Sequence, residues 1–145
     1  GELGNNAQLG LRLGLAADAR FGEQDLGFIG PLAAPTGADA LAQRVQQLLG
    51  RAPLLLPGDG RPLRRVAWCT GGAQGYFEGA IAAGADVFLT GEVSEPQAHL
   101  ARETGVAFLA CGHHATERFG AAAVAAQVAA QFGLTHRFIE IDNPA

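Results

Sequence analysis

The regular alternation of strand-like and helix-like segments constrains the fold of this chain more than any other feature. Short runs rich in β-branched, aromatic and other apolar residues predict strands at 53–56, 65–69, 86–90, 106–111 and 135–141. Between them, segments at 75–83, 95–103 and 115–132 have the composition and length of helices. Such alternation is typical of βαβ crossovers, so we expect an α/β fold in which helices pack on a largely parallel or mixed sheet.

The first fifty residues predict three further elements. A helix ends at about Leu13, and a strand at 26–30 is followed by Pro31, which we expect to end it. A second helix lies between the candidate N-cap Thr36 and the candidate C-terminal stop Gly50. Because one α/β pattern runs through residues 1–145, we expect a single domain, but the order of the strands cannot be read from the pattern.

Composition limits the function classes that need to be considered. The chain has a net charge of −4, and its ten basic residues are all arginines without a strong basic patch, which argues against a nucleic-acid surface. No apolar run is long enough to span a bilayer, and no signal peptide is recognised, so we expect a cytoplasmic protein without membrane partners. Cys69 and Cys111 lie in apolar strand-like runs, which predicts buried, reduced thiols.

Three strand-to-helix junctions carry the residues with chemical potential. They lie at 69–75, 90–92 and 111–117. In open α/β sheets, ligands bind beyond the carboxyl ends of the strands, where helix N-termini present unpaired N–H groups. If these strands are parallel, all three junctions face one pocket.

The third junction is the most informative, because His113 and Glu117 are four residues apart at the start of a predicted helix. That spacing puts both side chains on one face of the helix, and imidazole nitrogen with carboxylate oxygen suits first-row divalent metals. In the alternative interpretation, Thr116 and Glu117 cap the helix and the histidines belong to a polar loop.

The other junctions leave their alternatives open. Gly71 and Gly72 either contact a phosphate through the backbone or only form a tight turn. Glu92 is either a general acid–base group at a strand end or a solvated carboxylate. His99 and His136 are expected to be ordinary surface or strand residues.

Two of these segments resemble a known protein family. Residues 84–92 are similar to its segment G-A-D-hydrophobic-T-G-[DE], and residues 112–117 are similar to its signature G-H-[HY]-x-[TS]-E. The opening residues 2–7 and the closing residues 141–145 also resemble bacterial members. The family is that of the GTP cyclohydrolase I type 2 homologues, also called NGG-one-interacting-factor-three-like proteins.

The resemblance implies that His113 and Glu117 are ligands of a dinuclear centre of zinc, iron, manganese or magnesium. It also implies a homo-oligomer, commonly a hexameric toroid with its metal sites facing an internal cavity. The family's other ligands, a His-His pair and an Asp, come from an N-terminal part that this sequence lacks, so residues 1–145 resemble the C-terminal part of a longer protein. We therefore expect this chain alone to bind metal weakly or not at all, and to be inactive.

For the intact parent, the resemblance implies metal-dependent hydrolysis of GTP or another nucleotide. Glu92 is then the candidate for proton transfer, and Gly71 and Gly72 are candidates for contact with a phosphate of the substrate. The alternative is a non-catalytic protein, in which the metals stabilise an oligomeric scaffold or a regulatory interaction. Whether the protein is an enzyme is left open, because metal ligands have the same appearance in both classes.

Overall fold

The structure is a computed structural model that describes residues 1–145, and its centre is a mixed six-stranded sheet of order β1-β2-β4-β5-β6-β3. The strands are β1 (Ala19–Phe21), β2 (Gly27–Thr36), β3 (Leu54–Leu56), β4 (Leu63–Trp68), β5 (Val87–Thr90) and β6 (Ala107–Ala110). The helices are α1 (Asn5–Leu13), α2 (Ala38–Leu49), α3 (Phe77–Ala82), α4 (Glu95–Thr104) and α5 (His113–Phe132), with short 3₁₀ turns at Glu23–Asp25 and Gln74–Tyr76. This arrangement confirms the predicted α/β class.

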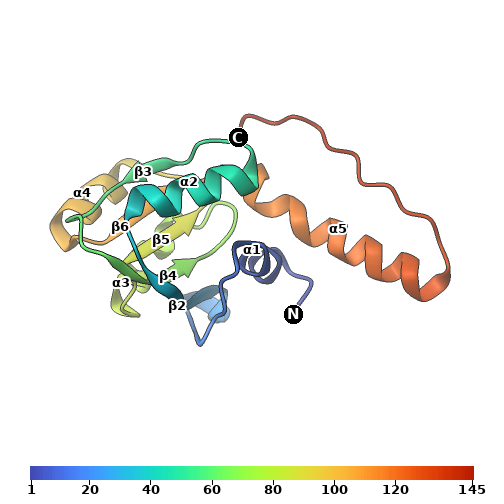
Figure 1. The fold of residues 1–145 in the computed structure, drawn as a ribbon, viewed down its shortest axis with the longest axis horizontal. Coiled ribbons are helices and arrows are strands. Elements are labelled where there is room, and N and C mark those ends of the chain that lie inside the picture. Colours follow the sequence, from blue (N-terminus) through green and yellow to red (C-terminus); the bar gives the residue numbers. More distant parts are fainter.

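Strands β4, β5 and β6 form the parallel centre of the sheet (Figure 1). On one side β2 pairs antiparallel with β4, and β1 pairs antiparallel with β2. On the other side β3 pairs antiparallel with β6. The three parallel strands therefore have their carboxyl ends at the same edge of the sheet, which is where the three junctions begin.

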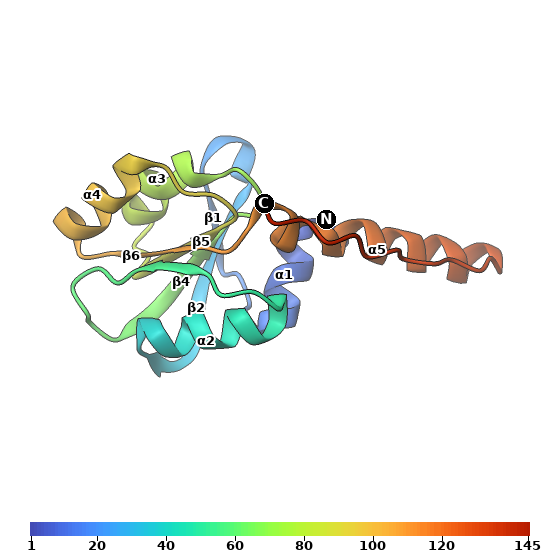
Figure 2. The same ribbon diagram turned by 90° about the horizontal axis from the view of Figure 1, so that it is seen from above.

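The helices cover the sheet in two layers, with α1 and α2 on one face and α3 and α4 on the other (Figure 2). Successive residues of a strand point to opposite faces, so Val66 and Trp68 contact the α1–α2 layer while Ala67 faces the α3–α4 layer. The second layer is anchored by an aromatic group, in which Phe88 packs against Phe21, Phe77 and Phe108. All strands of the parallel centre are thus buried on both faces.

The prediction that the strand at 26–30 ends at Pro31 is wrong, because β2 continues to Thr36 with a register irregularity after Pro31. β1 pairs with β2 only at Gly27, Phe28 and Ile29, so the missing N–H of Pro31 falls where β2 has a neighbour on one side only. β1 itself was not predicted, since three residues are too few to show an alternating pattern.

The predicted last strand at 135–141 is also wrong. These residues form an extended, exposed segment that leaves the end of α5 and turns back toward the body of the molecule (Figure 1). Its apolar pattern suits a strand, but no strand of the sheet lies next to it, so no ladder forms. α5 begins at His113, two residues before the predicted start.

Two smaller predictions concern the surface and the thiols. Cys69 and Cys111 are both buried, as predicted, and burial raises the pKa of each thiol. His99 and His136 are exposed, as expected for surface residues. None of the helices is both long and apolar enough to cross a membrane.

Candidate metal centre

The loops that follow β4, β5 and β6 are joined to one another through their backbones. Gly91 donates its N–H to the carbonyl of Gly71 over 2.9 Å, and Gly112 donates to the carbonyl of Gly91 over 2.8 Å. The buried hydroxyl of Thr90 also donates to the Gly71 carbonyl, over 3.1 Å. These bonds confirm the prediction that the three junctions converge at one edge of the sheet.

Thr116 attaches the first turn of α5 to this edge. Its side chain is fully buried, and its hydroxyl accepts the N–H of Gly71 over 3.0 Å. The N-cap residue of α5 is Gly112, with a φ of 97° and no side-chain cap. The interpretation in which Thr116 and Glu117 cap the helix is therefore wrong, because the Thr116 hydroxyl binds the loop after β4 instead.

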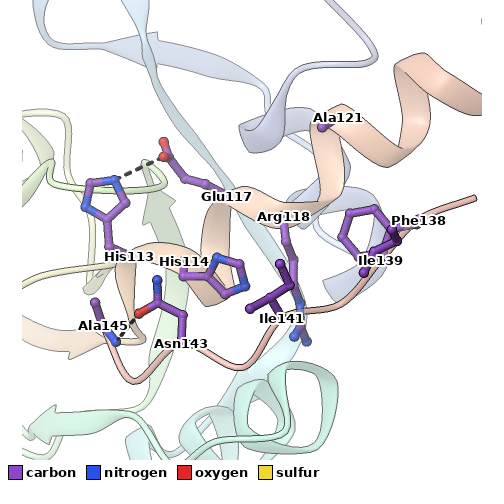
Figure 3. A pocket seen from close by; sticks show the side chains of 10 residues that line it. All are labelled: His113, His114, Glu117, Arg118, Ala121, Phe138, Ile139, Ile141, Asn143 and Ala145. Carbon is purple, nitrogen blue, oxygen red and sulfur yellow. Dashed lines mark hydrogen bonds and ion pairs between the residues drawn. The ribbon is translucent and has the colours of Figure 1, made fainter.

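His113 lies between two carboxylates. Its Nδ1 is 2.6 Å from Oε1 of Glu92, and its Nε2 is 3.1 Å from Oε2 of Glu117 (Figure 3 shows the second contact). The three side chains are 40–45% exposed, so the group is open to a ligand on one side. Glu92 follows β5, whereas His113 and Glu117 share one face of α5, so the sheet brings together residues that are distant in sequence.

The charges of this group shift its protonation. The hydrogen bond with Glu92 is the largest of the effects that raise the pKa of His113, and the nearby Glu117 carboxylate acts in the same direction. Conversely, the hydrogen bonds from His113 and Gln74 lower the pKa of Glu92. Without a cation, two carboxylates therefore favour a protonated imidazole between them.

Gly71 is the glycine whose missing side chain matters most here. Its φ is +72°, and a Cβ would lie 2.5 Å from Oε1 of Glu117 and 3.2 Å from Nε2 of His113. The space in front of the pair is therefore kept free by a residue without a side chain. The Gly71 N–H donates to Thr116, so a phosphate contact through that group would require this hydrogen bond to break. The phosphate contact expected of Gly71 and Gly72 stays a prediction.

The donor atoms fit part of a divalent metal site. Two neighbouring ligands with bonds of about 2.1 Å lie roughly 3.0–3.4 Å apart at octahedral or tetrahedral angles, and His113 Nε2 and Glu117 Oε2 are 3.1 Å apart. No group of three or more His, Cys, Asp or Glu side chains is arranged to hold a metal ion. Glu92 does not supply a third ligand beside them, since it faces the opposite nitrogen of the ring. The His113–Glu117 pair is therefore a candidate for two ligand positions and no more.

A pocket of about 440 Å³ lies next to this pair, between α5 and the returning C-terminal segment (Figure 3). His114 and Arg118 line it from the helix, and both approach Glu140 of the segment, at 3.5 Å and 2.9 Å respectively. His114 therefore turns away from the His113–Glu117 pair.

Sequence reasoning missed Gln74 and the linking role of Thr116. Gln74 Nε2 donates to Oε2 of Glu92 over 3.2 Å, from the loop after β4. Both residues lie inside predicted junctions, which was the only signal available for them. Their partners depend on which strands are neighbours, and that order could not be predicted.

The fold and this group of side chains define a class: an α/β protein with a His–Glu pair at the carboxyl edge of parallel strands. Residues 1–144 match the family model of Duf34/NIF3 (NGG1p interacting factor 3), and the chain belongs to this family. The resemblance seen in the sequence is thereby confirmed.

Relatives and solved structures agree with this assignment. A GTP cyclohydrolase 1 type 2 homolog of Neisseria meningitidis serogroup B is 52% identical over 143 residues, covering 99% of this chain and 57% of the relative. A homolog of the same name from Pseudomonas aeruginosa is 48% identical over 147 residues, with 99% and 58% covered. The structure of protein ybgI, described as of unknown function, superimposes with a TM-score of 0.93 at 43% identity, covering 99% of this chain and 58% of that one. The chain thus spans less than three-fifths of these proteins.

Proposed function

We propose that this chain supplies the His113–Glu117 part of a dinuclear metal site in a metal-dependent hydrolase that acts on a nucleotide. The observation that carries the proposal is the 3.1 Å pair of His113 Nε2 and Glu117 Oε2, held beside a glycine that leaves the space in front of it free. The nucleotide is suggested by the name of the relatives, GTP cyclohydrolase 1 type 2 homolog.

Divalent cations at such a site would supply Lewis-acid activation of water and of a substrate oxygen. The chain's own contribution is to place the two ligands rigidly, since Thr116 ties their helix to the neighbouring loop. A complete site needs further ligands. We place them, as the family resemblance implies, in a His-His pair and an Asp from the additional length that the relatives have.

Glu92 is the candidate for proton transfer near this pair. It is ionised at neutral pH and can accept a proton, and its lowered pKa makes it a weaker base than an unperturbed glutamate. Its half-exposed carboxylate can also be reached by solvent. This role and the phosphate contacts of Gly71 and Gly72 belong to the same proposal.

A second candidate function is a non-catalytic oligomeric scaffold. It is favoured by exposed apolar side chains on the far half of α5, where Val124, Val128 and Phe132 are 42–65% exposed. These residues recur at intervals of four, so they form one stripe along the helix. In this second proposal, the scaffold is a hexameric toroid in which the stripe is buried. The mass of the assembly in solution tests it.

Nucleotide hydrolysis tests the first proposal, in what we call the full-length protein: this chain together with the additional length that the relatives have. GTP and other nucleoside triphosphates are incubated with the protein, with zinc or manganese and with a chelator. Hydrolysis is expected to need the metal and to be lost in His113→Ala and Glu117→Gln, while His99→Ala, a histidine on the surface of α4, keeps it. A protein that retains metal but turns over no nucleotide would support the scaffold instead.

A further inference from the structure

We infer that Glu92 is a positioning residue: it holds the His113 ring in the orientation and tautomer that leave Nε2 available to a divalent cation. This inference deepens the proposed function and rests on it. It concerns the bound cation already proposed, and it replaces proton transfer with positioning as the role of Glu92. The assignment follows from three features of the geometry.

The first feature is which nitrogen each carboxylate contacts. Glu92 Oε1 is 2.6 Å from Nδ1 of His113, whereas Glu117 Oε2 is 3.1 Å from Nε2, on the other side of the ring. A metal-binding histidine usually donates its second N–H to a carboxylate, which fixes the tautomer and increases the basicity of the ligating nitrogen. Glu92 has the position of that carboxylate, and Glu117 has the position of a fellow ligand.

The second feature is that Glu92 is itself held in place. Gln74 Nε2 donates to Glu92 Oε2 over 3.2 Å, so each carboxylate oxygen has one partner. Gln74 is held in turn, because the side chain of Gln97 donates to its backbone carbonyl over 3.1 Å. Gln97 is 6% exposed and also accepts the N–H of Ser94 in the capping box of α4. A side chain fixed through this chain of contacts suits orientation better than movement toward a substrate.

The third feature is the space around the group. A Cβ at Gly72 would lie 3.3 Å from Glu92 Oε1, and a Cβ at Gly71 would lie 2.5 Å from Glu117 Oε1. The two adjacent glycines therefore let the loop after β4 pass close to both carboxylates. A larger side chain would crowd one of these carboxylates, more severely at Gly71 than at Gly72.

The tautomer of His113 tests the inference directly, in the metal-free 145-residue chain. Long-range ¹H–¹⁵N correlation spectra are recorded at alkaline pH, where the ring is neutral. We expect the proton on Nδ1 in the original chain and in Glu92→Gln, whose amide oxygen still accepts that bond. Glu92→Leu and Glu92→Ala are expected to lose the preference, whereas Glu95→Gln, a change at an 89% exposed carboxylate three residues away, should leave it intact.

Zinc affinity of the full-length protein, measured by calorimetry, supplies the second readout. Loss of an outer carboxylate weakens metal binding about 10- to 100-fold, so Glu92→Leu should fall in that range, with Glu92→Gln less affected. An Nε2–H tautomer in the original chain, or an affinity unchanged in Glu92→Leu, would overturn the inference. If His113→Ala leaves zinc binding unchanged, the proposed function fails instead, so the two failures are distinguishable.

Discussion

The carboxyl edge of the sheet and the C-terminal arm, residues 121–145, are constructed in opposite ways. At the edge, the loops bind one another through the backbones of Gly71, Gly91 and Gly112. The returning segment of the arm is instead tied by a few side chains, in which Arg51 donates to the carbonyls of Pro144 and Ala145 and Arg118 binds Glu140. At the edge, backbone hydrogen bonds between loops of this chain fix where the site residues lie. In the arm, several apolar side chains are exposed to solvent.

This difference indicates which region is suited to a chemical site and which is suited to contact with other molecules. A group that must keep its geometry, such as the His113–Glu117 pair, lies where backbone hydrogen bonds surround it. An exposed apolar stripe has no such support within the chain and suits contact with another surface. The two regions should therefore respond to mutation in very different ways.

The largest effect is expected from Phe88→Ala in the sheet that supports the edge. Phe88 is fully buried among three aromatic rings, and removing it should cost about 3–5 kcal/mol of unfolding free energy. Phe132→Ala is the matched change in the arm, at a ring that is 65% exposed, and it should stay within about 0.5 kcal/mol. Urea unfolding of both variants measures the contrast, and equal losses would mean that the arm is part of the core.

A smaller effect is expected from Gly71→Ala. Its left-handed φ alone costs an alanine about 1–2 kcal/mol, and the new Cβ also meets the Glu117 carboxylate. Gly133→Ala, in the arm, has the same kind of φ with nothing within 4 Å. The excess loss in Gly71→Ala, measured in the same unfolding experiment, reports the contact. Identical losses of unfolding free energy in the two variants would show that the contact of the new Cβ with the Glu117 carboxylate has no energetic effect.

The pH dependence of stability should show the charged group at the edge. The raised pKa of His113 gives stability that is fully present below its unfolded pKa of about 6.5 and is lost as pH rises through the folded pKa. The lowered pKa of Glu92 gives stability that is present above about 4.3 and is lost as pH falls through its folded pKa. The contribution is therefore largest between roughly pH 4.3 and 6.5.

Unfolding free energies measured from about pH 4 to 9 for the original chain and for His113→Gln check this expectation. The difference between the two should be greatest within the window and should shrink on either side of it. The effect is modest, because all three side chains are half exposed. A constant difference from pH 4 to 9 would contradict the proposed ion pairing.

The smallest effect is expected from Ile139→Ser, on the returning segment of the arm. Ile139 is 68% exposed, so the change should alter the unfolding free energy by less than about 0.5 kcal/mol. If the arm is an interface in the assembled protein, the same substitution should reduce assembly, which sedimentation velocity measures. A large loss of monomer stability would show that the segment packs more tightly than its exposure indicates.

Much of the fold could be predicted because the information is local. The apolar runs that become β4, β5 and β6 are buried on both faces, and helices separate them along the chain. This alternation favours parallel strands at the centre of the sheet, as observed. The last strand failed for the opposite reason: Phe138, Ile139 and Ile141 suit a strand, but a strand needs a neighbour, and residues 1–145 provide none there. Pairing is not a local property.

The residues of the candidate site also fall into those that local spacing predicts and those that depend on which strands are neighbours. The spacing of His113 and Glu117 on one turn of helix is local, and the structure places them on one face as predicted. The contact of Glu92 with His113 depends on β5 and β6 being neighbours, which no pattern revealed. Gln74 is further removed, because it acts on Glu92 from the loop after β4. Residues that act through another residue therefore could not be identified before the sheet was known.

Calorimetric titration with zinc shows whether His113 and Glu117 are two ligands of a larger metal site. The 145-residue chain is expected to bind zinc weakly or not at all, whereas the full-length protein is expected to bind two ions tightly and to lose that binding in His113→Ala but not in His99→Ala. Two tightly bound ions in the 145-residue chain, or tight binding by the full-length protein that survives His113→Ala, would contradict this assignment.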